Sequence, residues 1–124
     1  MNKIKYETTV VKSGPLAQEF IESGILVFFG MNAPEELAEF SILHEHTQLH
    51  QDVVAGDLLF IDDNSYEVLA VGEVANQNLS NLGHLVVKFN GQTEPEMPGD
   101  ISVPKIKELP KIKPGTKVRI IASE

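Results

Sequence analysis

Short apolar runs separated by turn-forming residues are the feature that most constrains the fold of this chain. Nine glycines and seven prolines are spread over 124 residues, so few regular elements can run far before they meet a residue that ends them. A glycine and a short polar residue begin the strand-like segments 56–60, 99–103 and 115–119. Glycine supplies the positive φ of tight turns, so each of these segments is predicted to begin with a tight turn that is followed by a strand. This pattern is typical of an all-β protein, a small barrel or sandwich.

Apolar periodicity predicts where the regular elements lie. Alternating or continuously apolar runs predict strands at 4–10, 25–29, 40–50, 57–61, 66–71, 84–91, 101–103 and 116–123. The polar residues 62–65 join two of these strands into the clearest hairpin. Short helices are expected at 16–21, 33–39 and 75–83. No linker divides the chain, so we expect a single all-β, barrel-like domain over residues 1–124 with two or three short helices.

Charge and composition exclude several classes of function. With 18 acidic and 10 basic residues, the net charge is -8, which disfavours nucleic acid and anionic membranes as partners. The chain contains no cysteine, so disulfides, thiolate metal sites and cysteine nucleophiles are ruled out. No apolar run approaches the length of a membrane span, and no signal peptide precedes the first strand. The expectation is a cytoplasmic protein.

The candidate chemistry lies in the segment 40–50, which holds three of the four histidines. In a strand, alternate residues share a face, so Phe40, Ile42, His44 and His46 are expected to line one side. Imidazole can be a nucleophile, a proton carrier or a metal ligand near neutral pH. The segment therefore predicts a histidine site displayed on a β scaffold.

Three interpretations of this pair remain open from the residues alone. The two rings can be idle surface groups. They can bind a metal with His50 or His84 as a third ligand, an arrangement that resembles the His-x-His of cupin barrels, although Gln48 stands near where cupins place an acid.

The third interpretation is phosphoryl transfer through one neutral, exposed imidazole. His46 and the hydroxyl of Thr47 would then donate hydrogen bonds to the phosphoryl oxygens. No P-loop pattern occurs in the chain, so a nucleotide held in that way is not the expected source of the phosphoryl group.

Motifs distributed along nearly the whole chain add a family resemblance. Their order and spacing resemble the glucitol/sorbitol-specific IIA component of the bacterial phosphoenolpyruvate-dependent sugar phosphotransferase system. The motifs are Tyr6-Glu7-Thr8-Thr9-Val10, Ala33-Pro34 with Leu37, His44-Glu45-His46, Ala70-Val71-Gly72-Glu73-Val74-Ala75 with Asn78-Leu79, Leu82-Gly83-His84, Phe89-Asn90-Gly91, Pro98-Gly99 and Pro114-Gly115. The segment 47–54 departs from the family pattern, and His50 has no counterpart in it.

The resemblance implies a specific function. Such a protein accepts a phosphoryl group from the histidine-containing phosphocarrier protein and passes it to a cysteine of the IIB subunit. The IIB and IIC subunits of the transporter then phosphorylate glucitol (sorbitol) as it enters the cell. By resemblance His44 is the phosphoryl acceptor, His46 supports it, and His84 either stabilises the phosphoryl group or has a structural role. Thr47, from its place beside the pair, is a further candidate stabilising group.

Several further expectations accompany this function. No cofactor or metal is needed, because positioning and hydrogen-bond donors carry the catalysis. The ring of His44 is expected to be open to visiting proteins, with Phe40 and Leu43 in the docking surface. A regulatory relative that keeps the fold without transferring phosphate is a further alternative. A homodimer formed through a free strand edge also stays open.

Overall fold

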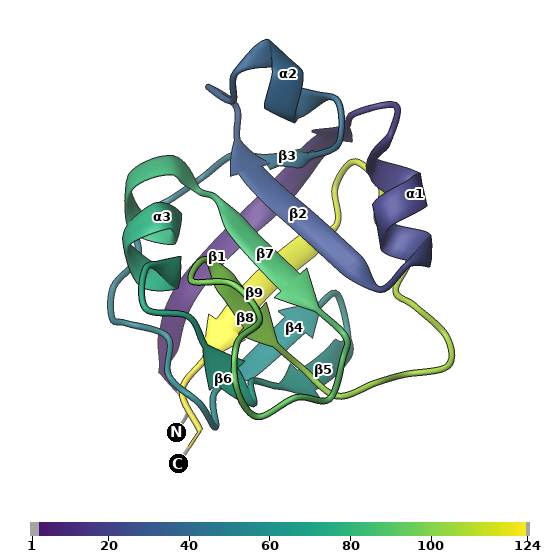
Figure 1. Cartoon of the computed structure of the whole chain (residues 1–124). Helices are drawn as coiled ribbons and strands as arrows, with labels where there is room; N and C mark the ends of the chain where they lie inside the picture. Colours follow the sequence, from purple (N-terminus) through teal and green to yellow (C-terminus); the bar gives the residue numbers. More distant parts are fainter. Residues whose placement is uncertain (1–2, 124) are drawn as a thin grey trace.

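The computed structural model describes residues 3–123, which form one curled β-sheet with three short helices around it (Figure 1). This confirms the expected all-β, barrel-like class. The strands are β1 (Ile4–Ser13), β2 (Ile25–Gly30), β3 (Ile42–His44), β4 (Leu58–Ile61), β5 (Asn64–Glu67), β6 (Ala70–Val71), β7 (Leu85–Lys88), β8 (Asp100–Ser102) and β9 (Lys117–Ile121). The helices are α1 (Ala17–Glu22), α2 (Glu35–Ala38) and α3 (Ala75–Leu82). No helix in this part of the chain is long and apolar enough to cross a membrane.

The sheet curls because its two ends are tied together by the chain itself. The strands are ordered β5-β4-β9-β1-β3-β2-β7-β8-β6, so β5 and β6 lie at opposite ends of the sheet. In sequence, however, only Val68 and Leu69 separate these two strands. Val68 donates its N–H to Asp57 next to β4, and Leu69 donates to Ser102 in β8. Two residues span only about 7 Å, so the two ends of the sheet must meet.

Strand β1 is the longest described strand and lies next to the central strand of the sheet, β3, with β9 on its other side. The expected alternation holds for Tyr6, Thr8 and Val10, whose side chains are buried on the inner face. It fails at the start of the strand, where the pairing with β9 shifts between Ile4 and Tyr6. This irregularity leaves Ile4 exposed and buries Lys5, the reverse of the expected pattern.

The hairpin and the helices lie close to their expected positions, with two differences. Strands β4 and β5 form the predicted hairpin, but its turn is shorter than the expected 62–65: the chain turns at Asp62, whose φ is 51°, and β5 already begins at Asn64. The run 66–71 was expected to be one strand, but it divides between β5 and β6 at the two ends of the sheet. Helix α3 ends at Gly83, which adopts the left-handed conformation that stops a helix (φ 66°).

Candidate functional site

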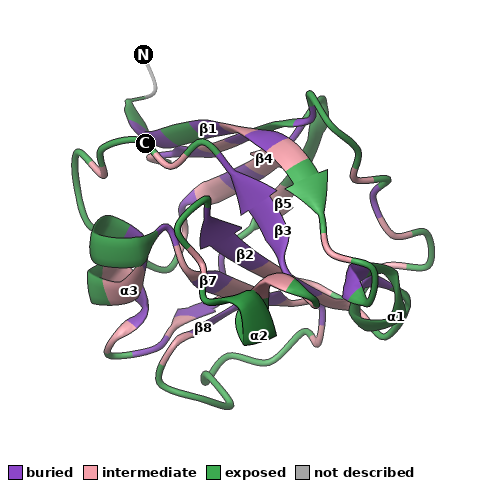
Figure 2. Cartoon of the chain, turned by 90° about the horizontal axis from the view of Figure 1, so that it is seen from above, coloured by how far each residue is buried: buried purple, intermediate pink, exposed green. Residues whose placement is uncertain are grey.

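His44 is the last residue of β3, and its side chain is buried inside the sheet. The strand pairs antiparallel with β1 and parallel with β2, and all three of its residues are buried (Figure 2). The ring packs edge-on against Tyr6 and Phe28, at centroid distances of 6.3 and 6.0 Å. Its relative exposure is 1%. The expectation that this ring is open to visiting proteins is therefore wrong for the structure described.

Three hydrogen bonds surround the imidazole of His44. Its Nε2 lies 2.7 Å from the carbonyl oxygen of Gly83. A carbonyl can only accept, so Nε2 carries the ring proton and donates it. The other nitrogen, Nδ1, then accepts from the Thr8 hydroxyl at 2.9 Å and from the backbone N–H of His46 at 3.2 Å. Both ring nitrogens are satisfied, and the ring is neutral.

His46 lies beside this ring but no longer belongs to the strand. Its φ of 43° is left-handed, so the alternation expected to continue from His44 breaks here. The side chain is half-buried, and the two imidazole centroids are 6.1 Å apart. Its Nδ1 accepts from the Tyr6 hydroxyl at 2.7 Å, while Nε2 lies 3.2 Å from the carbonyl oxygen of Ser80 and donates to it.

The two rings are held in the same way. Each Nδ1 accepts from a hydroxyl on β1, and each Nε2–H donates to a backbone carbonyl at the C-terminal end of α3. The carbonyls at this end of a helix carry partial negative charge, which suits a ring that gains positive charge. We call this arrangement the imidazole clamp; it consists of His44 and His46 with Tyr6, Thr8, Ser80 and Gly83.

Gly83 lets the helix end come this close to the rings. A Cβ atom built at Gly83 would lie 2.9 Å from Cγ of His46 and 3.0 Å from Cε1 of His44. Both distances are shorter than ordinary carbon contacts. A side chain at this position would have to displace one of the two imidazoles.

The protonation states of the clamp follow from burial. Burial lowers the pKa of His44, and the nearby His46 lowers it further, while the hydrogen bond to the Gly83 carbonyl acts in the opposite direction. Burial also raises the pKa of Tyr6 to about 12. The Tyr6 hydroxyl therefore keeps its proton at neutral pH and remains a donor to His46.

His84 is not brought together with this pair. Its ring stacks on Phe29 at a centroid distance of 4.6 Å, whereas the ring of the preceding Phe28 packs on His44. Successive residues of a strand point to opposite faces, so His84 lies on the other face of β2 from His44. Its Nδ1 donates to the Phe28 carbonyl at 3.0 Å. The expected phosphoryl-stabilising position of His84 beside His44 is not found.

Thr47 also faces away from the ring of His44. Its hydroxyl donates to the carbonyl oxygen of Glu7 at 2.5 Å, on the exposed side of β1. Its backbone N–H donates to the Tyr6 hydroxyl at 3.3 Å. The hydroxyl nearest to His44 is that of Thr8, which the sequence analysis did not single out.

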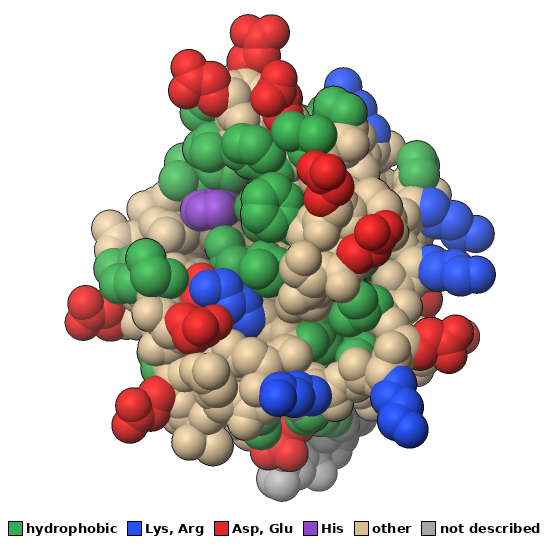
Figure 3. Space-filling model, turned by 45° about the vertical axis from the view of Figure 1, so that its right-hand side comes forward, with side chains coloured by type: hydrophobic (Ala, Val, Ile, Leu, Met, Phe, Trp, Pro, Cys, Tyr) green, Lys and Arg blue, Asp and Glu red, His purple; other side chains and the backbone are tan. Residues whose placement is uncertain are grey.

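The two expected docking residues differ in exposure. Leu43 is buried, whereas Phe40 is half-buried and its ring packs edge-on against Phe20 at 5.6 Å. The surface in Figure 3 shows acidic side chains gathered at the top, where α2 lies, and hydrophobic side chains below them with a histidine among them. The large apolar residues exposed on the elements near the clamp are Met31, Leu37 and Leu82.

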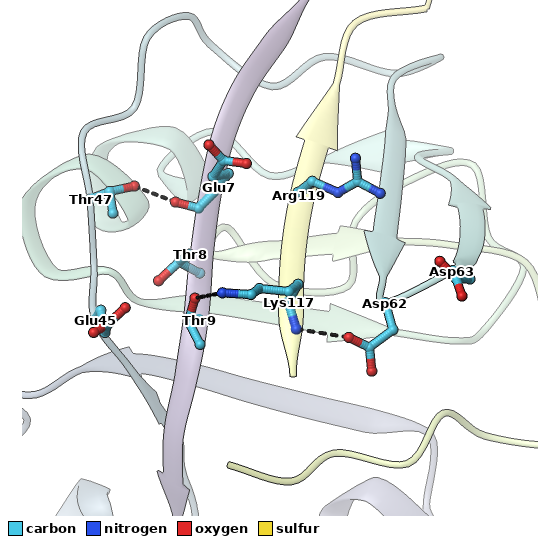
Figure 4. Close-up of a pocket in the computed structure, with 9 residues that line it drawn as sticks. All are labelled: Glu7, Thr8, Thr9, Glu45, Thr47, Asp62, Asp63, Lys117 and Arg119. Atoms are coloured by element: carbon cyan, nitrogen blue, oxygen red, sulfur yellow. Dashed lines mark hydrogen bonds between the residues drawn. The ribbon is translucent and has the colours of Figure 1, made fainter. Parts of the chain in front are cut away.

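A hollow on the described surface is distinct from the imidazole clamp, although Thr8 borders both. It has a volume of about 790 Å³ and lies over the outer face of β1 and β9 (Figure 4), lined by Glu7, Thr8, Thr9, Glu45, Thr47, Asp62, Asp63, Lys117 and Arg119. Four carboxylates face only two cations there, so the hollow does not favour a phosphoryl group. The Nζ atom of Lys117 donates a hydrogen bond to the Thr9 hydroxyl at 2.9 Å.

The three-histidine metal site also does not form. Within residues 3–123, no three histidine, aspartate or glutamate side chains gather closely enough to hold a metal ion. His50 is exposed on the segment that follows the pair, and its backbone N–H donates to the Lys5 carbonyl. The cupin-like alternative therefore has no support from the geometry.

Comparisons with known proteins place these residues in a family context. The sequence model described as "PTS system glucitol/sorbitol-specific IIA component" matches residues 5–119. Two relatives, from Shigella flexneri and Escherichia coli (strain K12), are both called "PTS system glucitol/sorbitol-specific EIIA component". Each is 35% identical over 98 residues, which is 79% of this chain and 80% of the relative. The crystal structure of a PTS system IIA component from Enterococcus faecalis V583 is similar with a TM-score of 0.76 and 26% identity, covering 91% of this chain and 97% of that one.

Proposed function

Because the chain belongs to the family of glucitol/sorbitol-specific IIA components of the phosphotransferase system, we propose that it is a phosphohistidine carrier with His44 as the acceptor. The phosphoryl group comes from the histidine-containing phosphocarrier protein. It leaves to a cysteine of the IIB subunit, which serves uptake and phosphorylation of glucitol (sorbitol) through IIC. The carrier works in the cytoplasm. The observation that carries this proposal is the neutral, doubly hydrogen-bonded ring of His44 within a chain of this family.

The chemistry asked of His44 is a simple exchange of bonds. A lone pair on one ring nitrogen forms a new N–P bond while the N–P bond to the donor histidine breaks. In the second step this N–P bond breaks as an S–P bond forms at the cysteine thiolate. A neutral imidazole is required, and the lowered pKa of His44 keeps the ring in that form. His46 supports the reacting ring through its backbone N–H and its position alongside.

Transfer needs a second, open arrangement of the clamp, because neither nitrogen of His44 is accessible in the closed one. On the side of α3 the ring is covered by His46, which is half-buried, and by Gly83, which is buried next to the exposed Leu82. We propose that docking of the carrier protein displaces this cover and exposes the ring. Small local openings of this kind are common where few apolar contacts hold a segment.

Labelling from radioactive phosphoenolpyruvate through the two general carrier proteins tests the function. Wild type is expected to take up one phosphoryl group, and His44→Gln none. His46→Gln should be slowed, and His84→Gln should react like wild type, since His84 lies on the other face of β2. Equal labelling of His44→Gln and wild type would remove the acceptor assignment. A wild-type protein that takes up no label would favour a regulatory relative that keeps only the fold.

A further inference from the structure

Tyr6 and Thr8 place two hydroxyl groups on the inner face of β1, two residues apart. The imidazoles they face, His46 and His44, are also two residues apart, on the chain that runs antiparallel to β1. Each hydroxyl reaches the Nδ1 atom of one ring, at 2.7 Å for the Tyr6–His46 contact and 2.9 Å for the Thr8–His44 contact. Each hydroxyl therefore bonds to one imidazole.

The partners of His44 together select one state of its ring. The Gly83 carbonyl can only accept, and the His46 backbone N–H can only donate. With the proton on Nε2, all three contacts are satisfied and Thr8 acts as a donor. With the proton on Nδ1, the carbonyl would face a lone pair and the His46 N–H would face another N–H. Buried polar groups left without partners are costly, so the proton stays on Nε2.

The hydroxyl of Thr8 is not needed to fill space. Thr8 is 5% exposed and lies between Tyr6 and Val10 on the core-facing side of β1. A valine would have nearly the same shape there and would carry no polar group to bury. The specific property that threonine contributes is therefore its hydrogen bond to the ring.

We infer that Thr8 and Tyr6 are positioning residues for phosphoryl transfer at His44. In the closed clamp Thr8 fixes the orientation and tautomer of the His44 ring, and Tyr6 does the same for His46, whose backbone N–H completes the contacts of His44. These contacts set the state of the ring that the docking carrier protein meets. Neither residue touches the phosphoryl group in the closed clamp; both act through the imidazoles. A reacting ring held in one orientation needs less reorganisation at the moment of transfer. This inference rests on the proposed function.

A set of β1 variants tests the inference: Thr8→Val removes the hydroxyl, Thr8→Ser keeps it, and Thr9→Val is the matched control. Thr9 is the next residue, and its hydroxyl contacts Lys117 on the opposite face of the strand. Two readouts are measured: the nitrogen chemical shifts of the His44 ring by NMR, and the rate of label uptake from the phosphorylated carrier protein. Thr8→Val is expected to shift the ring resonances and slow uptake about tenfold. Thr8→Ser should recover most of the rate, and Thr9→Val should match wild type.

Tyr6→Phe provides a second, independent variant. Its expected effect is a shift of the His46 ring resonances and slower uptake, with the His44 resonances changed less. A Thr8→Val protein that takes up label at the wild-type rate overturns the inference, whatever its ring resonances show. So does Thr9→Val slowing uptake as much as Thr8→Val. If wild type takes up no label, the proposed function fails, while the ring shifts still report whether the hydroxyls position the imidazoles.

Discussion

At the scale of single residues, the buried ring of His44 makes stability depend on pH. Burial lowers its folded-state pKa below the ordinary value of 6.5. Between these two pKa values the unfolded chain binds a proton that the folded chain does not bind. The stabilising contribution of the neutral ring is therefore complete above about pH 6.5 and is lost as the pH falls toward the lowered folded-state pKa.

We predict that the free energy of unfolding of wild type falls more steeply between about pH 7 and about pH 5 than that of His44→Gln. The variant lacks the titrating ring, so the pH dependence of its stability comes from the other titrating groups alone. Denaturant titrations at several pH values measure the difference between the two slopes. Parallel curves would show that His44 titrates in the folded protein as it does in the unfolded chain.

Residue patterns could predict part of the imidazole clamp. The alternation in β1 places Tyr6 and Thr8 on the buried face, and two polar side chains on an otherwise apolar face signal partners inside the protein. The pairing with histidines 36 and 40 positions away could not be predicted, because it depends on how β1 and β3 align. Nor could the left-handed backbone of His46 be predicted, since only a few per cent of non-glycine residues adopt a positive φ and no local pattern marks which ones do.

At the scale of elements, the end of α3 is fitted to the two imidazoles. Gly83 has a left-handed φ of 66°, and a Cβ atom there would meet both rings. Gly115 also has a left-handed φ, 94°, yet a Cβ there would have nothing within 4 Å. Alanine at either position carries the backbone penalty of about 1–2 kcal/mol.

We predict that Gly83→Ala loses more stability than Gly115→Ala and also slows label uptake, because only the first displaces the rings. Chemical denaturation and the uptake assay are measured on both variants. Gly115→Ala should keep the wild-type rate. Similar rates for the two variants would mean that the fit between α3 and the imidazoles does not matter for transfer.

A buried ion pair holds β1 to the segment that follows the histidines. Nζ of Lys5 lies 2.7 Å from Oδ2 of Asp57, with both side chains about 4% exposed. The same ammonium group donates to the carbonyl of Asp52, and the carboxylate accepts from the N–H of Val54. The pair therefore anchors the segment 52–57 to the sheet.

We predict that Asp57→Asn destabilises the protein by about 3–5 kcal/mol, because it leaves the Lys5 charge buried without its partner. Lys5→Met should cost a similar amount. The double variant should cost less than the sum of the two, since no lone charge remains. Urea unfolding of the three variants gives the interaction free energy between the two side chains. If the two single losses of stability add up to the loss in the double variant, the two side chains act independently.

At the scale of the whole molecule, the nine strands depend on one another. Ile101 is fully buried in β8 and pairs with Val87 in β7 and Val71 in β6. We predict that Ile101→Ala costs about 2–5 kcal/mol and that the protein still unfolds in one transition. Far-ultraviolet circular dichroism and tyrosine fluorescence should give the same midpoint. Two separate midpoints would show that the ends of the sheet unfold independently.

The sequence predicted the class of fold better than it predicted how the two ends of the sheet meet. Turn residues and periodicity located the strands and helices, because those signals are local. The run 66–71 looked like one strand, since alternation does not say which neighbour a strand pairs with. Its division between β5 and β6 depends on pairing partners 30 or more residues away, in β8. The same long-range closure buries His44, which no local pattern could reveal.

We propose that a ring enclosed in the resting fold becomes the phosphoryl carrier. Heteronuclear NMR tests this most directly, on protein with nitrogen-labelled histidine that has been phosphorylated through the carrier proteins. We predict a phosphorus coupled to a ring nitrogen of His44, with His46 and His84 unmodified. Phosphorus bonded to either of those rings, or to none, would contradict it.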